Sequence, residues 1–252
     1  MAAISAVAED PVRIEDKFKI HELNEESVYA VELYPLGIPT VVTVDGFIPT
    51  GLYGGTKFAY AGDDNSLWVM VLEKAIAKTY GTYAAMIGGD SVMGVSLLTG
   101  TPSVRYYSNN STSDELWEAI LKHDAQNDMM TSGTACGCGS GDSVANSYGL
   151  ACSHAYTIHG GFELSNGVRL VVVRNPWGTE GYAGPYSDTS SDWTEALKAE
   201  IPSYADALDG RFHMPIEDYM QSFRGIGANL DIQGMERVDF VVHDDENSDN
   251  VD

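Results

Sequence analysis

The chain has 252 residues, 44% of them apolar, so it is long enough to bury the core of one large domain or two small ones. Its 37 acidic and 14 basic side chains give a formal net charge of -23, which would repel a phosphate backbone and excludes nucleic acid as a partner. No apolar run approaches the roughly 18 to 20 residues of a membrane span, and residues 1–8 lack the basic start of a signal peptide. We therefore expect a globular, cytoplasmic protein.

The cysteines and the acidic end of the chain support this expectation. All three cysteines lie between Cys136 and Cys152, so they form no paired framework, and an intracellular setting would keep them reduced. Residues 243–252 are acidic and lack large apolar side chains. This composition predicts a solvated tail, with calcium binding or partner docking as the alternative.

The first 90 residues contain two clear structural patterns. Residues 1–24 show no strong period and are expected to be an irregular lead-in. Two β-rich runs between Tyr29 and Pro49 predict a hairpin. The run 67–78 is apolar nearly all round, has capping side chains before it and Gly81 after it, and predicts a buried helix.

The later elements are shorter. Glycines predict loops at 88–89 and 94–100, and Thr112-Ser-Asp-Glu115 has the form of a capping box that starts a helix. Residues 133–149, rich in Gly and Ser, are expected to form a strand and a flexible loop beside the site described next. Further strands are expected at 104–107 and 235–242, and further helices at 193–198 and 215–223.

A histidine and an asparagine lie on two neighbouring β-rich runs. His154 lies in the run 152–158, and Asn175, 21 residues later, lies in the run 170–178. A carboxamide can fix the tautomer of an imidazole without adding a charge that would compete with an imidazolium–thiolate pair. The pattern is typical of the base and orienting residue of a cysteine protease, and the alternative is a core histidine with satisfied hydrogen bonds.

The turn between the two runs raises a geometric question. A tight turn at Asn166-Gly167 would place Ile158 opposite Asn175 and leave His154 about 13 Å away along the strand. Contact therefore requires a longer connection or a bulge, which Gly160-Gly161 could supply.

Two sequence blocks around these residues resemble a known family. Ser153-His154-Ala155-Tyr156-Thr157-Ile158 and Val173-Arg174-Asn175-Pro176-Trp177-Gly178 closely resemble the His and Asn blocks of calpain-type cysteine proteases, usually Gly-His-Ala-Tyr and Arg-Asn-Pro-Trp-Gly. The resemblance extends back to residues 67–84 and forward through Asp192-Trp193, Asp209-Gly210 and Phe212-x-Met214. It covers roughly Tyr29 to Val242.

The resemblance implies an α+β, papain-like fold whose second subdomain is mainly antiparallel β with flanking helices. We expect a lead-in at 1–24, the end of the first calpain-core subdomain at 25–90, the second subdomain at 91–242 and the acidic tail at 243–252. The resemblance also implies that His154 is the catalytic base, Asn175 its orienting residue and Trp177 the indole that shields the pair.

The nucleophile that the family requires is not found. In papain-like enzymes the cysteine precedes the His and Asn by roughly 130 to 150 residues, which here falls within about positions 4 to 45. That range holds neither a cysteine nor the Gln-Gly-x-x-Gly-Asp-Cys-Trp block that supplies the thiol and an oxyanion donor. Cys136, Cys138 and Cys152 lie just before the His, in a region that resembles the second subdomain, so none is expected to be the nucleophile.

Two metal sites follow as alternatives. Cys136-x-Cys138 and Cys152-x-His154 would place three sulfurs and one imidazole around zinc, because residues two apart on a strand share a face. The resemblance implies calcium ligands at Asp188 and Asp209. However, Gly181 and Arg211 stand where the family commonly has glutamates, and an arginine opposes a divalent ion.

Three hypotheses follow. The first is the catalytic-core portion of an intracellular calpain-like endopeptidase, which supplies the base and orienting residue for thiol-dependent peptide-bond hydrolysis. As a chain alone it would be a pseudo-protease, and a Cys-bearing calpain half in the same or another polypeptide would complete it. The second is a non-catalytic calpain-like scaffold that binds protein partners in a larger assembly. The third is a zinc-binding module.

Overall fold

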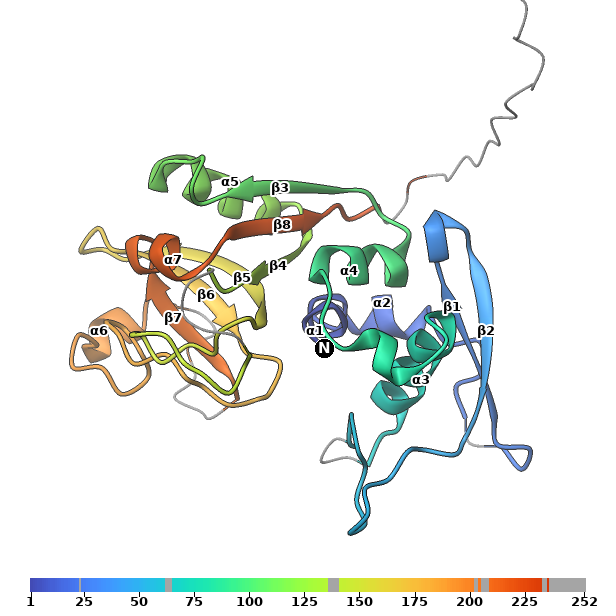
Figure 1. Cartoon of the computed structure of the whole chain (residues 1–252). Helices are drawn as coiled ribbons and strands as arrows, with labels where there is room; N and C mark the ends of the chain where they lie inside the picture. The colour runs from blue at the N-terminus through green and yellow to red at the C-terminus, as the bar shows by residue number, and fades with distance from the viewer. Residues whose placement is uncertain are drawn as a thin grey trace, which may run out of the picture.

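The computed structural model describes residues 1–22, 24–61, 65–135, 141–201, 204, 209–232 and 235, and it has an α+β fold. One part holds a six-stranded antiparallel sheet with strand order β3-β8-β4-β5-β6-β7, and the other holds the hairpin β1-β2 beside helices α1 to α4 (Figure 1). The strands are β1 Val28–Leu33, β2 Thr40–Asp45, β3 Ser103–Tyr107, β4 Met129–Gly133, β5 Ala155–Glu163, β6 Arg169–Arg174, β7 Arg211–Pro215 and β8 Gly225–Asn229. The helices are α1 Ala2–Val7, α2 Pro11–Glu15, α3 Trp68–Thr79, α4 Ser91–Thr99, α5 Ser113–Ala125, α6 Glu195–Lys198 and α7 Ile216–Ser222.

The start of the chain is ordered, which corrects the expectation of an irregular lead-in at 1–24. Helices α1 and α2 lie there, and Ile4, Ala6 and Val7 are buried in one apolar cluster with side chains of β1, α3 and α4. Helix α1 is only 6 residues long. Because so short a helix is marginal by itself, the packing of its apolar side chains stabilises it.

The predicted hairpin and buried helix are both confirmed. Strands β1 and β2 pair in antiparallel register from Val28 opposite Asp45 to Leu33 opposite Thr40. Helix α3 runs from Trp68 to Thr79 and buries side chains along most of its length. The predicted capping is not confirmed, because Leu67 lies at the N-cap of α3 and forms no side-chain cap hydrogen bond.

Helix α4 replaces a predicted loop at 94–100. Asp90 caps its first turn by accepting bonds from Val92 N and Met93 N, and Gly100 ends it at φ 72°. A Cβ placed on Gly94 would lie 2.8 Å from the Cβ of Ala3, so this glycine lets α1 and α4 approach closely. The limits of the two subdomains remain a prediction, but apolar side chains of α4 pack in the cluster that contains α1 and α3.

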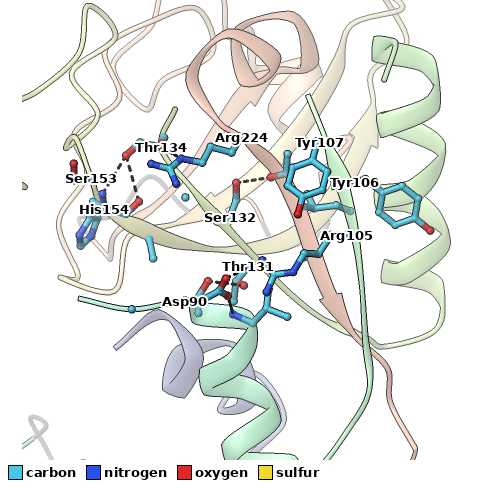
Figure 2. A pocket seen from close by; sticks show the side chains of 18 residues that line it. Asp90, Arg105, Tyr106, Tyr107, Thr131, Ser132, Thr134, Ser153, His154 and Arg224 are labelled. Atoms are coloured by element: carbon cyan, nitrogen blue, oxygen red, sulfur yellow. Dashed lines mark hydrogen bonds and ion pairs between the residues drawn. The ribbon is translucent and has the colours of Figure 1, made fainter. Parts of the chain in front are cut away.

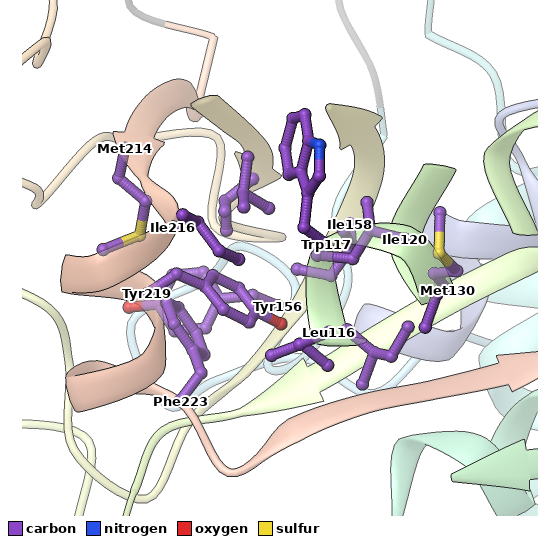
Figure 3. Close-up of a cluster of buried hydrophobic side chains, with 14 of the residues drawn as sticks. Leu116, Trp117, Ile120, Met130, Tyr156, Ile158, Met214, Ile216, Tyr219 and Phe223 are labelled. Atoms are coloured by element: carbon purple, nitrogen blue, oxygen red, sulfur yellow. The ribbon is translucent and has the colours of Figure 1, made fainter. Parts of the chain in front are cut away.

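The second apolar cluster lies between the six-stranded sheet and helices α5 and α7 (Figure 3). Helix α5 begins with the predicted capping box, in which Thr112 and Glu115 exchange hydrogen bonds. Its Trp117 packs so close to β5 that a Cβ on Gly161 would lie 2.5 Å from the indole. Leu116, Tyr156 and Tyr219 join it in this core.

Strand β8 was missed in the sequence because its residues are Gly-Ile-Gly-Ala-Asn, a composition that disfavours strands. It nevertheless lies between β3 and β4 and is buried throughout. The strand expected at 235–242 lies outside the described residues except for Met235, as does the acidic tail at 243–252. Within the described residues of the segment 133–149, Gly133 ends β4, Thr134 and Ala145 form isolated bridges, and turns lie at 141–149.

No helix within the described ranges is both long enough and apolar enough to cross a bilayer.

Candidate active site

The sheet brings His154 and Asn175 into direct contact. His154 Nε2 lies 3.0 Å from Asn175 Oδ1 at the adjoining ends of β5 and β6. Because the amide oxygen only accepts, this contact favours the neutral tautomer with the proton on Nε2. In the described part of the chain Nδ1 forms no hydrogen bond, so its lone pair is left to accept a proton.

Two irregularities in the β5–β6 pair create this contact. The last strand pair before the connection is Glu163 with Arg169, so the loop is longer than a two-residue turn. A bulge between Ile158 and Gly160 then shifts the register once more, and Thr157 pairs with Arg174. Asn175 consequently comes level with Tyr156, two residues nearer to His154 than a tight turn would place it. The longer connection and the bulge, which the sequence offered as alternatives, are therefore both present.

Aromatic rings surround the pair. The ring of Trp177 lies 4.1 Å from that of His154, and Tyr156 meets the imidazole edge-on at 4.9 Å. Trp177 N also donates to Asn175 Oδ1 at 3.1 Å, which fixes the carboxamide from a second side. Asn175 is 3% exposed, so its bond to the imidazole is largely withheld from water.

Burial is the main influence on the pKa of the His154 imidazole. Burial lowers the pKa of His154 below its ordinary value, while the bond to Asn175 and the charge of Asp142 oppose the shift. The α-amino group of Met1 adds a smaller lowering, so the start of α1 faces the same site. Figure 1 shows this N-terminus between the two parts of the molecule. Thr157 Oγ1 donates to the Ala2 carbonyl at 3.3 Å and holds α1 against β5.

The effect of Asp142 gives a testable prediction. The Asp142→Asn variant should lower the pKa of His154 further, because an exposed negative charge that favours the imidazolium is removed without a change in shape. A pH titration of the imidazole signals by NMR measures this. The Asp114→Asn variant, which removes a carboxylate that pairs with Arg169 elsewhere, should leave the pKa of His154 unchanged. Equal titration of wild type and Asp142→Asn would contradict the prediction.

A cavity of about 430 Å³ opens beside the imidazole, between α4, β3, β4, β8 and the start of β5. Figure 2 shows His154 and Thr134 at one end of this cavity and Tyr106 and Arg105 at the other. Thr134 joins the histidine to the wall, since His154 N donates to Thr134 Oγ1 at 3.1 Å and Thr134 N donates to the His154 carbonyl at 2.9 Å.

The cysteines differ from their expected state. Cys152 is buried and disulfide-bonded, which corrects the expectation of reduced thiols, while Cys136 and Cys138 lie outside the described residues. A disulfide sulfur is not the thiolate that zinc binds, and His154 Nε2 is already engaged by Asn175. The predicted zinc site is therefore wrong in its use of Cys152.

The implied calcium ligands Asp188 and Asp209 remain a prediction. Asp209 accepts a bond from the backbone N of Arg211 at 2.8 Å, and Asp188 lies half-buried in a neighbouring turn. Across the ranges that the structure describes, no group of three or more His, Cys, Asp or Glu side chains is arranged to hold a metal ion.

His213, next to this region on β7, should make the stability of the protein sensitive to acid. Its ring is 2% exposed and neither ring nitrogen has a hydrogen-bond partner in the described structure. Burial, followed by the charge of Arg211, lowers the pKa of His213 to about 4. Protonation is therefore easier in the unfolded chain, and the stabilisation present above about pH 6.5 is lost as the pH falls toward 4.

The expected loss from His213 is roughly 2 to 3 kcal/mol of unfolding free energy between pH 7 and pH 4. Urea denaturation at a series of pH values measures it. The His213→Phe variant keeps a ring between Trp193 and Tyr204 but does not titrate, so its stability should fall less steeply. Parallel pH curves for the two proteins would exclude this role.

Three residues around the site were not predicted from the sequence: Thr134, Asp142 and Arg224. Thr134 and Arg224 are 90 positions apart and meet because β4 and β8 are adjacent in the sheet. Asp142 lies in the Gly- and Ser-rich segment that was expected to flank the site, and this was the one available signal.

Comparison with known proteins agrees with the geometry. The family described as calpain family cysteine protease matches residues 1–228. The chain is 33% identical over 228 residues to the calpain-type cysteine protease ADL1 of Oryza sativa subsp. japonica, and the match covers 88% of the chain and 10% of that protein. It is 30% identical over 206 residues to the calpain-1 catalytic subunit of Homo sapiens, covering 78% of the chain and 28% of that protein.

The chain thus spans about a tenth of the first relative and about a quarter of the second. The matched region includes both sequence blocks around the imidazole and carboxamide, and it also includes α1, which the sequence resemblance had left out. The protein belongs to the calpain family of cysteine proteases.

Proposed function

We propose that this chain supplies the base and the orienting residue of a calpain-like endopeptidase, and that a cysteine outside these 252 residues supplies the thiol. The observation that carries the proposal is the 3.0 Å contact between His154 Nε2 and Asn175 Oδ1, which leaves Nδ1 unbonded in the described structure. A neutral imidazole held in this tautomer is suited to take the proton of a thiol.

The reaction divides into two steps. Nδ1 of His154 takes the thiol proton, and the thiolate attacks the scissile carbonyl carbon. The imidazolium then gives its proton to the leaving amine as the peptide bond breaks, which leaves a thioester. In the second step Nδ1 removes a proton from water, whose oxygen attacks the thioester and releases the carboxylic acid and the thiol.

The surroundings of the pair suit both stages. Because burial lowers the pKa of His154, the imidazole is neutral near pH 7 and ready to accept a proton. Asn175 and Asp142 act in the opposite direction and favour the imidazolium once it has formed. Trp177 covers the hydrogen bond to Asn175, and a carboxamide partner adds no negative charge that would compete with the thiolate.

The position of α1 supports a thiol carried by polypeptide just before Met1. Helix α1 is fixed to the sheet beside the imidazole through Thr157 and through Arg174, whose Nη1 donates to Ser5 Oγ at 2.7 Å. A residue that precedes α1 would therefore enter the site on the side of the imidazole.

A thiol-reactive peptide ketone tests the proposal on the protein in its longest form. We expect a single adduct, mapped by mass spectrometry to a cysteine outside residues 1–252, and we expect labelling to require His154. The exposed His21 provides a matched control, because His21→Ala should label like wild type. Labelling of Cys136, Cys138 or Cys152, or no labelling at all, would reject the peptidase and favour a non-catalytic scaffold.

A further inference from the structure

The wall of the cavity beside His154 is unusually polar for the interior edge of a sheet. Strand β4 and the residue after it supply Thr131, Ser132 and Thr134, all buried hydroxyl-bearing residues. Two arginines, Arg105 from β3 and Arg224 just before β8, also line it, together with Asp90 at the start of α4 (Figure 2). A site of this composition suits a polar or charged group better than an aliphatic side chain.

The two arginines differ in their partners. Arg105 Nη1 forms an ion pair with Asp90 Oδ2 at 2.9 Å, so its charge is balanced within the protein. Arg224 Nε donates to the Thr134 carbonyl at 3.0 Å, but no carboxylate of the described residues lies within ion-pair distance of its guanidinium. In a chain with a formal net charge of -23, Arg224 therefore places a positive charge on the wall of this cavity that no ion pair within the described residues balances.

The guanidinium of Arg224 is also held in place. The bond from Nε to the Thr134 carbonyl fixes one edge, and the backbone N of Arg224 donates to the Gly133 carbonyl at 3.0 Å. Thr134 is in turn joined to the backbone of His154 by three hydrogen bonds. The two terminal nitrogens of Arg224 are therefore positioned relative to the imidazole through a single intervening residue.

A planar guanidinium that already uses Nε presents its terminal nitrogens to one further acceptor, and a carboxylate matches that geometry and charge. We propose that Arg224 makes this cavity a specificity site for an acidic side chain, aspartate or glutamate, lying close to the scissile bond of a polypeptide substrate. The inference rests on the proposed function, since it assigns a substrate class to the same site.

A peptide library that carries Glu or Gln at one position at a time tests this preference on the thiol-bearing protein. At one position near the cleaved bond we expect kcat/KM to be about tenfold higher for Glu than for Gln, because a charge-assisted hydrogen bond is gained. Since Arg224 is exposed, the preference should weaken as salt is raised. Arg224→Gln should abolish it, Arg224→Lys should restore part of it, and Arg224→Glu should replace it with a preference for Lys.

Arg169→Gln is the matched control, because it removes the same charge from β6, where Arg169 pairs with Asp114, and should keep the Glu preference. Absence of a Glu preference at every position, or a preference that survives Arg224→Gln, would overturn the inference while leaving the peptidase function intact. If no peptide is cleaved, the proposed function fails, and fluorescence anisotropy of the same labelled peptides on the 252-residue chain decides the inference. About tenfold weaker binding of the Glu peptides to Arg224→Gln would support it, and equal binding would reject it.

Discussion

Under the proposed function, replacing His154 with alanine is expected to lower kcat/KM for peptide cleavage by at least about 10⁴-fold. Asn175 orients the His154 imidazole through Nε2, which leaves Nδ1 to accept a proton. Both proposed steps transfer a proton through Nδ1. Cleavage of a fluorogenic peptide by the thiol-bearing protein measures the loss.

The His154→Ala variant should still fold, because the side chain is half-buried at the edge of the site and its ring lies outside the main apolar cluster. Circular dichroism and a denaturation curve close to wild type establish that the loss is chemical. Asn175→Ala should have a smaller effect, about 10²-fold, since the base remains but its tautomer and orientation are no longer held. A His154→Ala variant that cleaves within tenfold of wild type would refute the assignment of the base.

Replacing Gly225 with alanine is expected to lower the free energy of unfolding by about 3 kcal/mol or more. Gly225 begins β8 at φ 127°, a backbone conformation that a residue with a Cβ rarely adopts. A Cβ there would lie 1.9 Å from the Tyr106 carbonyl oxygen, so β3 and β8 would have to separate. The Gly225 carbonyl also accepts hydrogen bonds from Ser132 and from Tyr219. Urea denaturation measures the change.

Gly167 provides the control for this prediction. It also has a positive φ, 83°, but a Cβ added there meets no other atom within 4 Å. Gly167→Ala should therefore cost only the backbone strain, about 1 kcal/mol. If the two variants lose equal stability, the close approach of β3 and β8 is not what requires Gly225. Because Arg224 precedes this glycine, loss of the β3–β8 contact should also disturb the cavity beside His154.

Predictions from the sequence were accurate where a segment carried its own structural signals. The α5 capping box places complementary side chains three residues apart, and the β1–β2 runs are rich in residues that favour strands. The blocks around His154 and Asn175 likewise identified the family, which the comparison supports. These features depend on residues that are close together in the chain, so they can be predicted without knowledge of the tertiary structure.

Segments whose structure depends on distant neighbours were not predicted. Helix α4 contains Gly94 because Ala3 approaches it, and β8 is rich in glycine because β3 and Val92 leave little space beside it. Local propensity disfavours both elements, but burial of their apolar side chains outweighs that preference. The same limitation hid α1, whose apolar side chains gain their stability only from the cluster that they enter.

The sequence by itself determined the α+β class, the calpain resemblance and the choice of His154 and Asn175 as candidate site residues. Propensity and motif are properties of residues that are neighbours in the chain. Only the tertiary structure decided that the imidazole meets the carboxamide, because the bulge at Ile158 and Gly160 and the longer loop set the strand register. It also decided that Arg224 and Thr134 join the site, since sheet order, and not sequence distance, brings β4 beside β8.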